Sequence, residues 1–257
     1  MINYEWPAQD YAIGNYIQAT IANQYLNLFA TKPTDYILDI GCGDGSFSTS
    51  VVERVPEGGV LGIDRSANML AVAREKMTDY PNLSLQQTDV LMMDFSEQFN
   101  QVVSFWCLHW CPDLATAYMK IYGALKKGGR VLTIFPTGNC ALMRGIQSMI
   151  ATHEFPQLRH FKLSVDFEQV GDLPKLLTNV PFKNAQVDIK KHVILLPSLD
   201  IYRKFVCGLA LFQGQVPEDE ISVLNEALVK AYDLECQQKY QGKYWFDISI
   251  FLVTAEK

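Results

Sequence analysis

A glycine-rich segment near residue 40 constrains the fold of this chain more than any other feature. Residues 39–45 read Asp-Ile-Gly-Cys-Gly-Asp-Gly, and they follow an apolar run that begins at Tyr36 and precede helical spacing over 46–55. Glycines at alternate positions let the backbone turn sharply and let a ligand approach it without intervening Cβ atoms. The segment therefore predicts a strand, a ligand-binding loop and a helix, in that order.

The alternation of strand and helix continues after this glycine loop. Further short apolar runs are separated by helical spacing and by turn residues, and they lie at 60–64, 83–87, 101–106 and 130–135. Parallel strands need crossover connections, which are usually helices that cover the faces of the sheet. This rhythm predicts an α/β fold with a Rossmann-like, mostly parallel sheet and helices on both faces.

After Pro136 the alternation stops. Residues 137–153 have helical spacing and 155–172 are loop-rich, whereas 184–196 and 244–254 predict two more strands, which completes a seven-stranded sheet. Helices are expected between those strands at 198–211 and 218–238.

We therefore expect a single domain over 1–257. Its predicted parts are an N-terminal helical lid at 1–30, a cofactor-binding half at 36–135, a helical cap inserted at 137–183 and a completion of the sheet at 184–257. The lid prediction rests on a helical pattern over 9–30 that is preceded by aromatic residues, since lids commonly gate such sites.

Composition excludes several classes of protein. The net charge is −6, which argues against binding a nucleic acid through its phosphates. No run of eighteen apolar residues and no basic leader before an apolar run is present, so we expect no membrane span and no secretory signal. The six cysteines include no CxxC pair, which predicts reduced thiols in a cytoplasmic protein and no metal site.

Two acids at strand ends accompany the glycine loop. Asp64 ends the second predicted strand, where a carboxylate can accept ribose hydroxyls, and Asp89 ends the third. Each acid alone is equally compatible with a helix cap or a turn. The dinucleotide pattern G-x-G-x-x-G requires a glycine where Ser46 stands, so a nicotinamide-dependent oxidoreductase remains an alternative but fits less well.

Residues 38–45 resemble motif I of the class I S-adenosylmethionine-dependent methyltransferases, and the similarity extends over about 36–135. The resemblance implies S-adenosylmethionine as cofactor and an antiparallel last strand at 244–254. Its implied contacts are the glycines at the amino-acid end, Asp64 at the ribose, Arg65 and Met69 beside the adenine, and Asp89 with Val90 at the adenine amine. The full implied set is Asp39, Gly41, Cys42, Gly43, Gly45, Asp64, Arg65, Met69, Asp89, Val90 and Phe105.

The segment 104–110 follows the fourth predicted strand and resembles small-molecule carboxyl methyltransferases, particularly the juvenile hormone acid methyltransferases, as does the spacing over 11–18. Trans-aconitate methyltransferases share the same general layout. The resemblance implies that Gln18 and Trp110 donate hydrogen bonds to a substrate carboxylate. His109, the third candidate catalytic residue, is compatible with a general base or with a packed core histidine.

The predicted function is therefore methyl transfer to a small molecule, with O-methylation of a carboxylic acid favoured. Methylation of another oxygen or nitrogen nucleophile with His109 as base is the first alternative, and a binding protein that retains the fold without catalysis is another. The expected partner is a small-molecule methyl acceptor, and the chain is expected to be a monomer or a homodimer.

Overall fold

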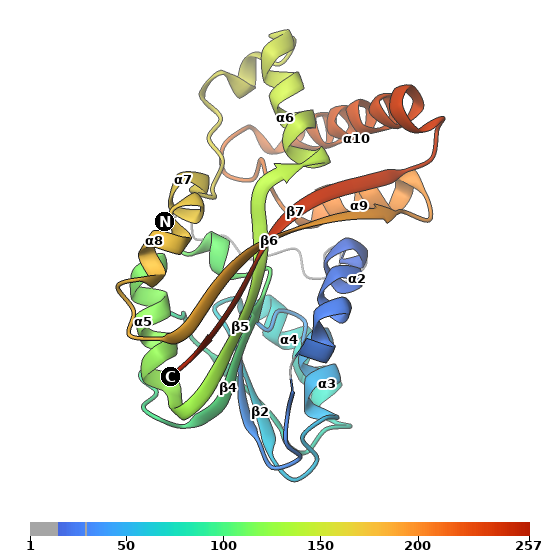
Figure 1. Ribbon diagram of the computed structural model, residues 1–257. Coiled ribbons are helices and arrows are strands. Elements are labelled where there is room, and N and C mark those ends of the chain that lie inside the picture. Colours follow the sequence, from blue (N-terminus) through green and yellow to red (C-terminus); the bar gives the residue numbers. More distant parts are fainter. Residues whose placement is uncertain (1–14, 29) are drawn as a thin grey trace. The chain divides into compact units, whose positions relative to one another are not determined.

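The computed structural model describes residues 15–28 and 30–257. Its strands are β1 (Tyr36–Ile40), β2 (Gly59–Asp64), β3 (Leu83–Gln87), β4 (Phe99–Phe105), β5 (Leu125–Cys140), β6 (Lys183–Leu195) and β7 (Trp245–Glu256). They form one seven-stranded sheet in the order β3-β2-β1-β4-β5-β7-β6 (Figure 1). The predicted Rossmann-like sheet is confirmed.

The five strands β3, β2, β1, β4 and β5 are parallel to one another. In β1, Leu38 lies opposite Leu61 of β2 on one side and Val102 of β4 on the other. The seven residues of β4 are almost all buried, which is typical of a central parallel strand with both faces covered. The carboxyl ends of these strands meet at one edge of the sheet, where open α/β sheets bind their ligands.

The last strand runs against the others. The N–H of Gly128, near the start of β5, donates to the carbonyl of Lys257 just after β7, and the N–H of Lys257 donates to the carbonyl of Gly129, both at 2.9 Å. Farther along, the rings of Phe135 and Phe251 lie 6.1 Å apart. Residue numbers rise on one strand as they fall on the other, which confirms the predicted antiparallel last strand.

Helices cover both faces of the sheet. Figure 1 shows α3 (Ser46–Val52) and α4 (Ala67–Met77) on one side and α5 (Leu114–Ala124) on the other. Side chains fix where two of them begin, because Ser66 accepts a hydrogen bond from the Met69 N–H and Asp113 accepts one from the Thr116 N–H.

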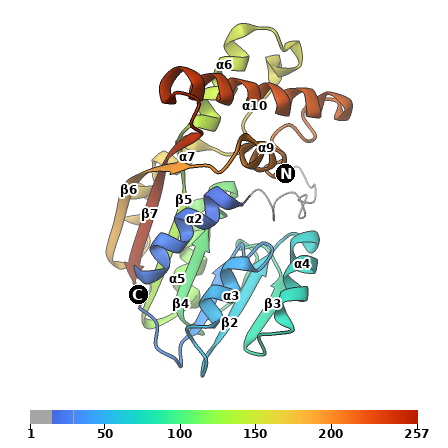
Figure 2. The ribbon, with the colours of Figure 1, turned by 90° about the vertical axis from the view of Figure 1, so that its right-hand side faces the viewer.

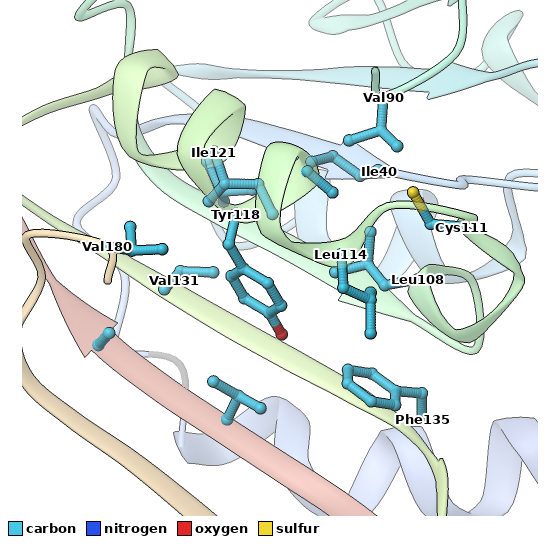
Figure 3. Packing of buried hydrophobic residues seen from close by; sticks show 14 of the residues in the cluster. Ile40, Val90, Leu108, Cys111, Leu114, Tyr118, Ile121, Val131, Phe135 and Val180 are labelled. Atoms are coloured by element: carbon cyan, nitrogen blue, oxygen red, sulfur yellow. The ribbon is translucent and has the colours of Figure 1, made fainter. Parts of the chain in front are cut away.

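The core lies between α5 and the sheet. Figure 3 shows Tyr118 and Ile121 of α5 packed beside Val131 and Phe135 of β5, and all four side chains are buried. The Tyr118 hydroxyl shares a 2.6 Å hydrogen bond with the Thr133 hydroxyl, so the one polar atom of this ring is satisfied inside the core.

The chain divides into two compact units. Of the described residues, the larger contains 21–137, 165–190 and 250–257, and the smaller contains 15–20, 138–164 and 191–249. In the smaller unit, α10 (Glu218–Tyr240) packs against α6 (Ala141–Thr152) and α9 (Leu199–Gly208) (Figure 2). Arg144 on α6 forms ion pairs with Glu235 of α10 at 2.8 Å and with Asp247 of β7 at 2.5 Å.

The predicted cap range is shared between the two units. Residues 138–164 belong to the smaller unit, with η3 (Pro156–His160), and 165–190 belong to the larger, with α7 (Phe167–Gly171) and α8 (Leu173–Leu177). The loop-rich prediction for 155–172 was therefore wrong for η3 and α7. Asp166 caps the start of α7, because its side chain accepts hydrogen bonds from the N–H groups of Glu168 and Gln169.

Two other boundaries differ from the predictions. Strand β5 extends well beyond 130–135, because its start is hydrogen-bonded to the end of β7, and α6 consequently begins at Ala141 rather than 137. The predicted helix over 9–30 includes α2 (Tyr16–Tyr25) and η1 (Leu26–Leu28). Residues 1–14 and 29, half of the predicted lid at 1–30, lie outside the described residues.

Candidate active site

The glycine loop links β1 to α3, and all three glycines of the motif have left-handed backbone conformations. Gly41 has φ +72° and Gly43 has φ +56°. A Cβ atom on Gly41 would overlap the side chain of Cys107, whereas one on Gly43 would meet no atom within 4 Å. The first glycine is thus required by packing within the chain, and the second leaves open space beside the loop.

Asp64 joins the end of β2 to this loop. One carboxylate oxygen accepts the N–H of Gly43 at 3.0 Å and the other accepts the N–H of Ser66 at 2.8 Å. Burial raises the pKa of Asp64, and these two backbone bonds oppose that rise by favouring the charged form. Each oxygen keeps a further lone pair for a ligand hydroxyl, and the side chain is only partly buried.

Asp39 is in a different position from the other strand-end acids. It is only 2% exposed, and its carboxylate accepts a 2.6 Å hydrogen bond from the hydroxyl of Ser48 on α3. Burial raises its pKa to about 7, and the nearby Asp64 adds to the rise. In this structure Asp39 therefore fastens α3 to β1 beneath the loop.

The loop has a further acid that sequence reasoning missed. Asp44 is buried, accepts bonds from the N–H and hydroxyl of Ser46, and forms a 2.9 Å ion pair with Lys76 of α4. The residue before the last glycine of such a loop is a plausible turn position, but nothing in the sequence indicated Lys76, which is 32 residues away.

The remaining predicted cofactor residues lie around β2, β3 and β4. Asp89 is partly buried after β3, and one of its oxygens accepts the N–H of Leu91 at 2.8 Å. Val90 and Met69 are buried, Arg65 is exposed, and Cys42 is buried in the loop with a pKa that burial raises. Phe105, at the end of β4, packs its ring 4.0 Å from that of Phe47.

The segment after β4 contacts the glycine loop directly. The hydroxyl of Ser104 donates to the carbonyl of Ile40 at 2.9 Å, which joins β4 to the last residue before the loop. Trp106 then has φ +59°, an unusual conformation for a tryptophan, and this turn leads into Cys107 against Gly41. The two predicted halves of the site are therefore adjacent in the larger unit.

His109 and Trp110 lie in the short 3₁₀ helix η2 (Leu108–Trp110). His109 is buried, and its Nδ1 atom has no hydrogen-bond partner among the residues that the structure describes. Burial lowers the pKa of His109 to about 3. Its ring lies 5.1 Å from that of the partly buried Trp110 and 6.4 Å from that of Phe135. Burial also raises the pKa of the Cys107 thiol, and that of Cys111 to about 11.

A glutamine that the sequence did not reveal holds this segment in place. The side-chain oxygen of Gln169, on α7, accepts the N–H of Leu114 at 2.6 Å, and its amide nitrogen lies 3.4 Å from the carbonyl oxygen of Cys111. The two elements are more than fifty residues apart, so no local pattern could indicate the contact.

Gln18, the remaining candidate, is buried on α2 and belongs to the smaller unit, whereas His109 and Trp110 belong to the larger. Within the described residues no group of three or more His, Cys, Asp or Glu side chains could hold a metal ion. None of the helices in that part of the chain is both long and apolar enough to span a membrane.

A family model described as "Methyltransferase domain" matches residues 37–129, which include β1, the glycine loop, Asp64, Asp89 and the segment after β4. The chain contains a methyltransferase domain and is an S-adenosylmethionine-dependent methyltransferase. This match supports the methyltransferase interpretation of the glycine loop over the dinucleotide one.

Two curated proteins and one solved structure illustrate what this methyltransferase is similar to. It is 26% identical over 199 residues to juvenile hormone acid O-methyltransferase of Bombyx mori, covering 73% of this chain and 70% of the relative. It is 31% identical over 112 residues to trans-aconitate 2-methyltransferase of Deinococcus radiodurans, covering 44% and 42%. The structure of Haemonchus contortus phosphoethanolamine N-methyltransferase 2 superposes with a TM-score of 0.62 and 20% identity over 97% of this chain and 57% of that one, which shows a shared fold.

Proposed function

We propose that this methyltransferase transfers the methyl group of S-adenosylmethionine to a carboxylate oxygen of a small organic acid. The observation that carries the proposal is the lack of a base poised near neutral pH in the segment 107–111. The pKa of His109 is lowered to about 3, and the pKa values of Cys107 and Cys111 are raised. A carboxylate is already ionised at pH 7 and needs no base, unlike a phenol or an ammonium group.

The similarities support the same substrate class. Two of the relatives have names that state a carboxylic acid substrate, juvenile hormone acid and trans-aconitate. Their identities of 26% and 31% do not specify which acid is used, so the proposal extends to the class of substrate and not to a particular compound.

The residues present fit the cofactor. Open space beside Gly43 admits a ligand against the backbone, and Asp64 retains acceptor capacity on both oxygens for ribose hydroxyls. We assign Gly41, Gly43 and Gly45 to the amino-acid end, Arg65 and Met69 to the two sides of the adenine, and Asp89 with Val90 to its amine. Asp39, Cys42 and Phe105 support these contacts from below the loop and from β4.

The protein's own part in the reaction is orientation and exclusion of water. The cofactor supplies an electrophilic methyl group, and in-line displacement requires the acceptor oxygen to be held on the axis of the bond that breaks. The indole N–H of Trp110 orients the carboxylate by donating a hydrogen bond. His109, neutral in this pH range, contributes a polar ring edge to an otherwise apolar surface.

One observation favours a second candidate function. The Nδ1 atom of His109 is buried without a partner, and an acceptor hydroxyl or amine would satisfy it by donating a hydrogen bond. In that case the acceptor is another oxygen or nitrogen nucleophile and His109 receives its proton.

The test is transfer of a labelled methyl group from S-adenosylmethionine to matched panels of carboxylic acids, phenols and amines between pH 6 and 9. We expect label in the acids, with a rate that is flat over this range because the acceptor stays ionised.

Trp110→Phe should raise KM for the acid about tenfold through loss of a hydrogen bond to a charged group. Trp245→Phe, at the start of β7, is the matched control.

Label in phenols or amines alone, with a rate that is lost in His109→Gln, would support the second candidate and overturn the first. Binding of the cofactor without transfer to any panel would indicate a binding protein.

A further inference from the structure

Strand β6 forms a long edge of the sheet on which exposed apolar side chains alternate with charged ones. It has 13 residues, and in the part of the chain that the structure describes β7 is its sole neighbour (Figure 1). Its side chains include Ile189 at 60% exposure and Val193 at 61%. The opposite edge strand, β3, has five residues and none of the large exposed apolar side chains. Charged side chains, among them Asp188 and Lys190, also lie along this edge. Charges on an edge strand disfavour pairing with another strand unless that strand carries complementary charges.

The hydrogen bond that closes the β6–β7 ladder indicates which residues face outward. The N–H of Leu196 donates to the carbonyl of Tyr244 at 2.9 Å, immediately beyond the ends of both strands. In an antiparallel ladder the direction of these groups alternates along the strand, so even-numbered residues of β6 point their N–H and C=O toward β7. The backbone groups of Val187, Ile189 and Lys191 point away from the sheet.

The charged residues on either side of Ile189 are complementary to the same residues in a second copy of the strand. Asp188 and Lys190 flank it on one face of the strand and form a 3.1 Å ion pair, with side-chain exposures of 52% and 43%. When two copies of the strand pair antiparallel with a two-fold axis at Ile189, each Asp188 lies opposite the second copy's Lys190. Opposite charges across a ladder stabilise it and like charges destabilise it.

The two adjacent registers of the same edge bring like charges together. An axis at Lys191 places two lysines directly opposite each other, and an axis at Val187 places Lys183 opposite Lys191. The axis at Ile189 places Lys191 opposite Val187 and Lys183 opposite Leu195, so no like charges face each other. In this register, residues whose backbone N–H and C=O groups point away from β7 lie opposite one another. The two copies can therefore exchange the hydrogen bonds of an antiparallel pair.

We propose that β6 pairs with β6 of a second copy of this chain, antiparallel and centred on Ile189, to form a symmetric dimer with one continuous sheet. Such an interface is isologous, since the same patch serves both subunits, and self-complementary charge is what it requires. The proposal is independent of the acceptor and of the cofactor.

The first test is a charge swap, with dimer dissociation measured by analytical ultracentrifugation. Asp188→Lys and Lys190→Asp each place like charges opposite each other twice, and each should weaken the dimer roughly tenfold. The double variant Asp188→Lys/Lys190→Asp restores both attractive pairs and should return the dissociation constant to within about threefold of wild type. A monomer at the highest soluble concentration, or a dimer that is insensitive to the swap, would overturn the proposal.

The second test traps the register in the full chain. Residues at the two-fold axis of a hydrogen-bonded pair have Cα atoms about 5.5 Å apart, within the range of a disulfide. Ile189→Cys should therefore give a covalent dimer on mild oxidation. Val193→Cys is the control, because in this register it faces Ala185 of the second copy and should not crosslink beyond the background of the native cysteines. Equal crosslinking of both variants would contradict the register.

Discussion

The glycine loop and the segment after β4 lie against each other, but they differ in whether their buried polar groups have hydrogen-bond partners. Around the loop, the carboxylates of Asp39 and Asp64 accept bonds from Ser48, Gly43 and Ser66. In the segment, His109 is buried with Nδ1 unpaired and the thiol of Cys107 remains protonated. The polar groups of the loop therefore have partners within the chain, whereas one buried nitrogen of the segment has none among the described residues.

The largest expected effect comes from breaking the contact between the two regions. Gly41→Ala adds a Cβ that overlaps Cys107 and places alanine at φ +72°. Strain and overpacking together should weaken binding of S-adenosylhomocysteine about 100-fold or more, measured by calorimetry. Circular dichroism checks that the variant folds.

The matched control for this variant is Gly171→Ala on α7, where an added Cβ meets nothing within 4 Å and φ is not positive. It should bind S-adenosylhomocysteine as the wild type does. Unchanged binding by Gly41→Ala would show that the contact between loop and segment does not shape the cofactor site.

An intermediate effect is expected on the pH dependence of stability, which should have opposite signs for the two regions. The pKa of Asp39 is raised from 3.8 to about 7, so its contribution to stability is present below pH 3.8 and is lost as pH rises toward 7. The pKa of His109 is lowered from 6.5 to about 3, so its contribution is present above pH 6.5 and is lost as pH falls toward 3.

The measurement is urea unfolding of the wild type, Asp39→Asn and His109→Gln between pH 4 and 7. The stability of the wild type relative to Asp39→Asn should fall as pH rises, and relative to His109→Gln it should fall as pH drops, each by at most about 1.4 kcal/mol per pH unit. Differences that change in the same direction would show that at least one of the two groups is not buried as described.

The smallest effect is expected at the ion pair of the loop. Lys76→Met removes the partner of Asp44, but Asp44 keeps its two bonds from Ser46, and the Lys76 side chain is 33% exposed. Unfolding should therefore be easier by about 1 kcal/mol or less. Lys239→Met, which removes an exposed pair with Glu235, is the control and should cost no more. A loss of several kcal/mol would mean that the loop depends on this charge.

Local pattern was sufficient for the half of the chain with regular alternation. The glycine positions, the strand-end acids Asp64 and Asp89 and the cap at Ser66 each follow from rules that act over a few residues. The smaller unit was harder, because Arg144 meets Glu235 and Asp247 from about a hundred residues away. Likewise, the length of β5 depends on its pairing with β7.

The sequence by itself determined the order of strands and helices through residue 135 and the positions of the glycine loop and of the strand-end acids, because these depend on short-range backbone requirements. The tertiary structure decided the burial, the contacts and the protonation of the individual side chains. It buried Asp39 against Ser48, set Cys107 against Gly41, left His109 neutral and unpaired, and exposed the outer edge of β6. Burial and long-range contacts control pKa values and hydrogen-bond partners, and neither is encoded in the spacing of residues along a chain.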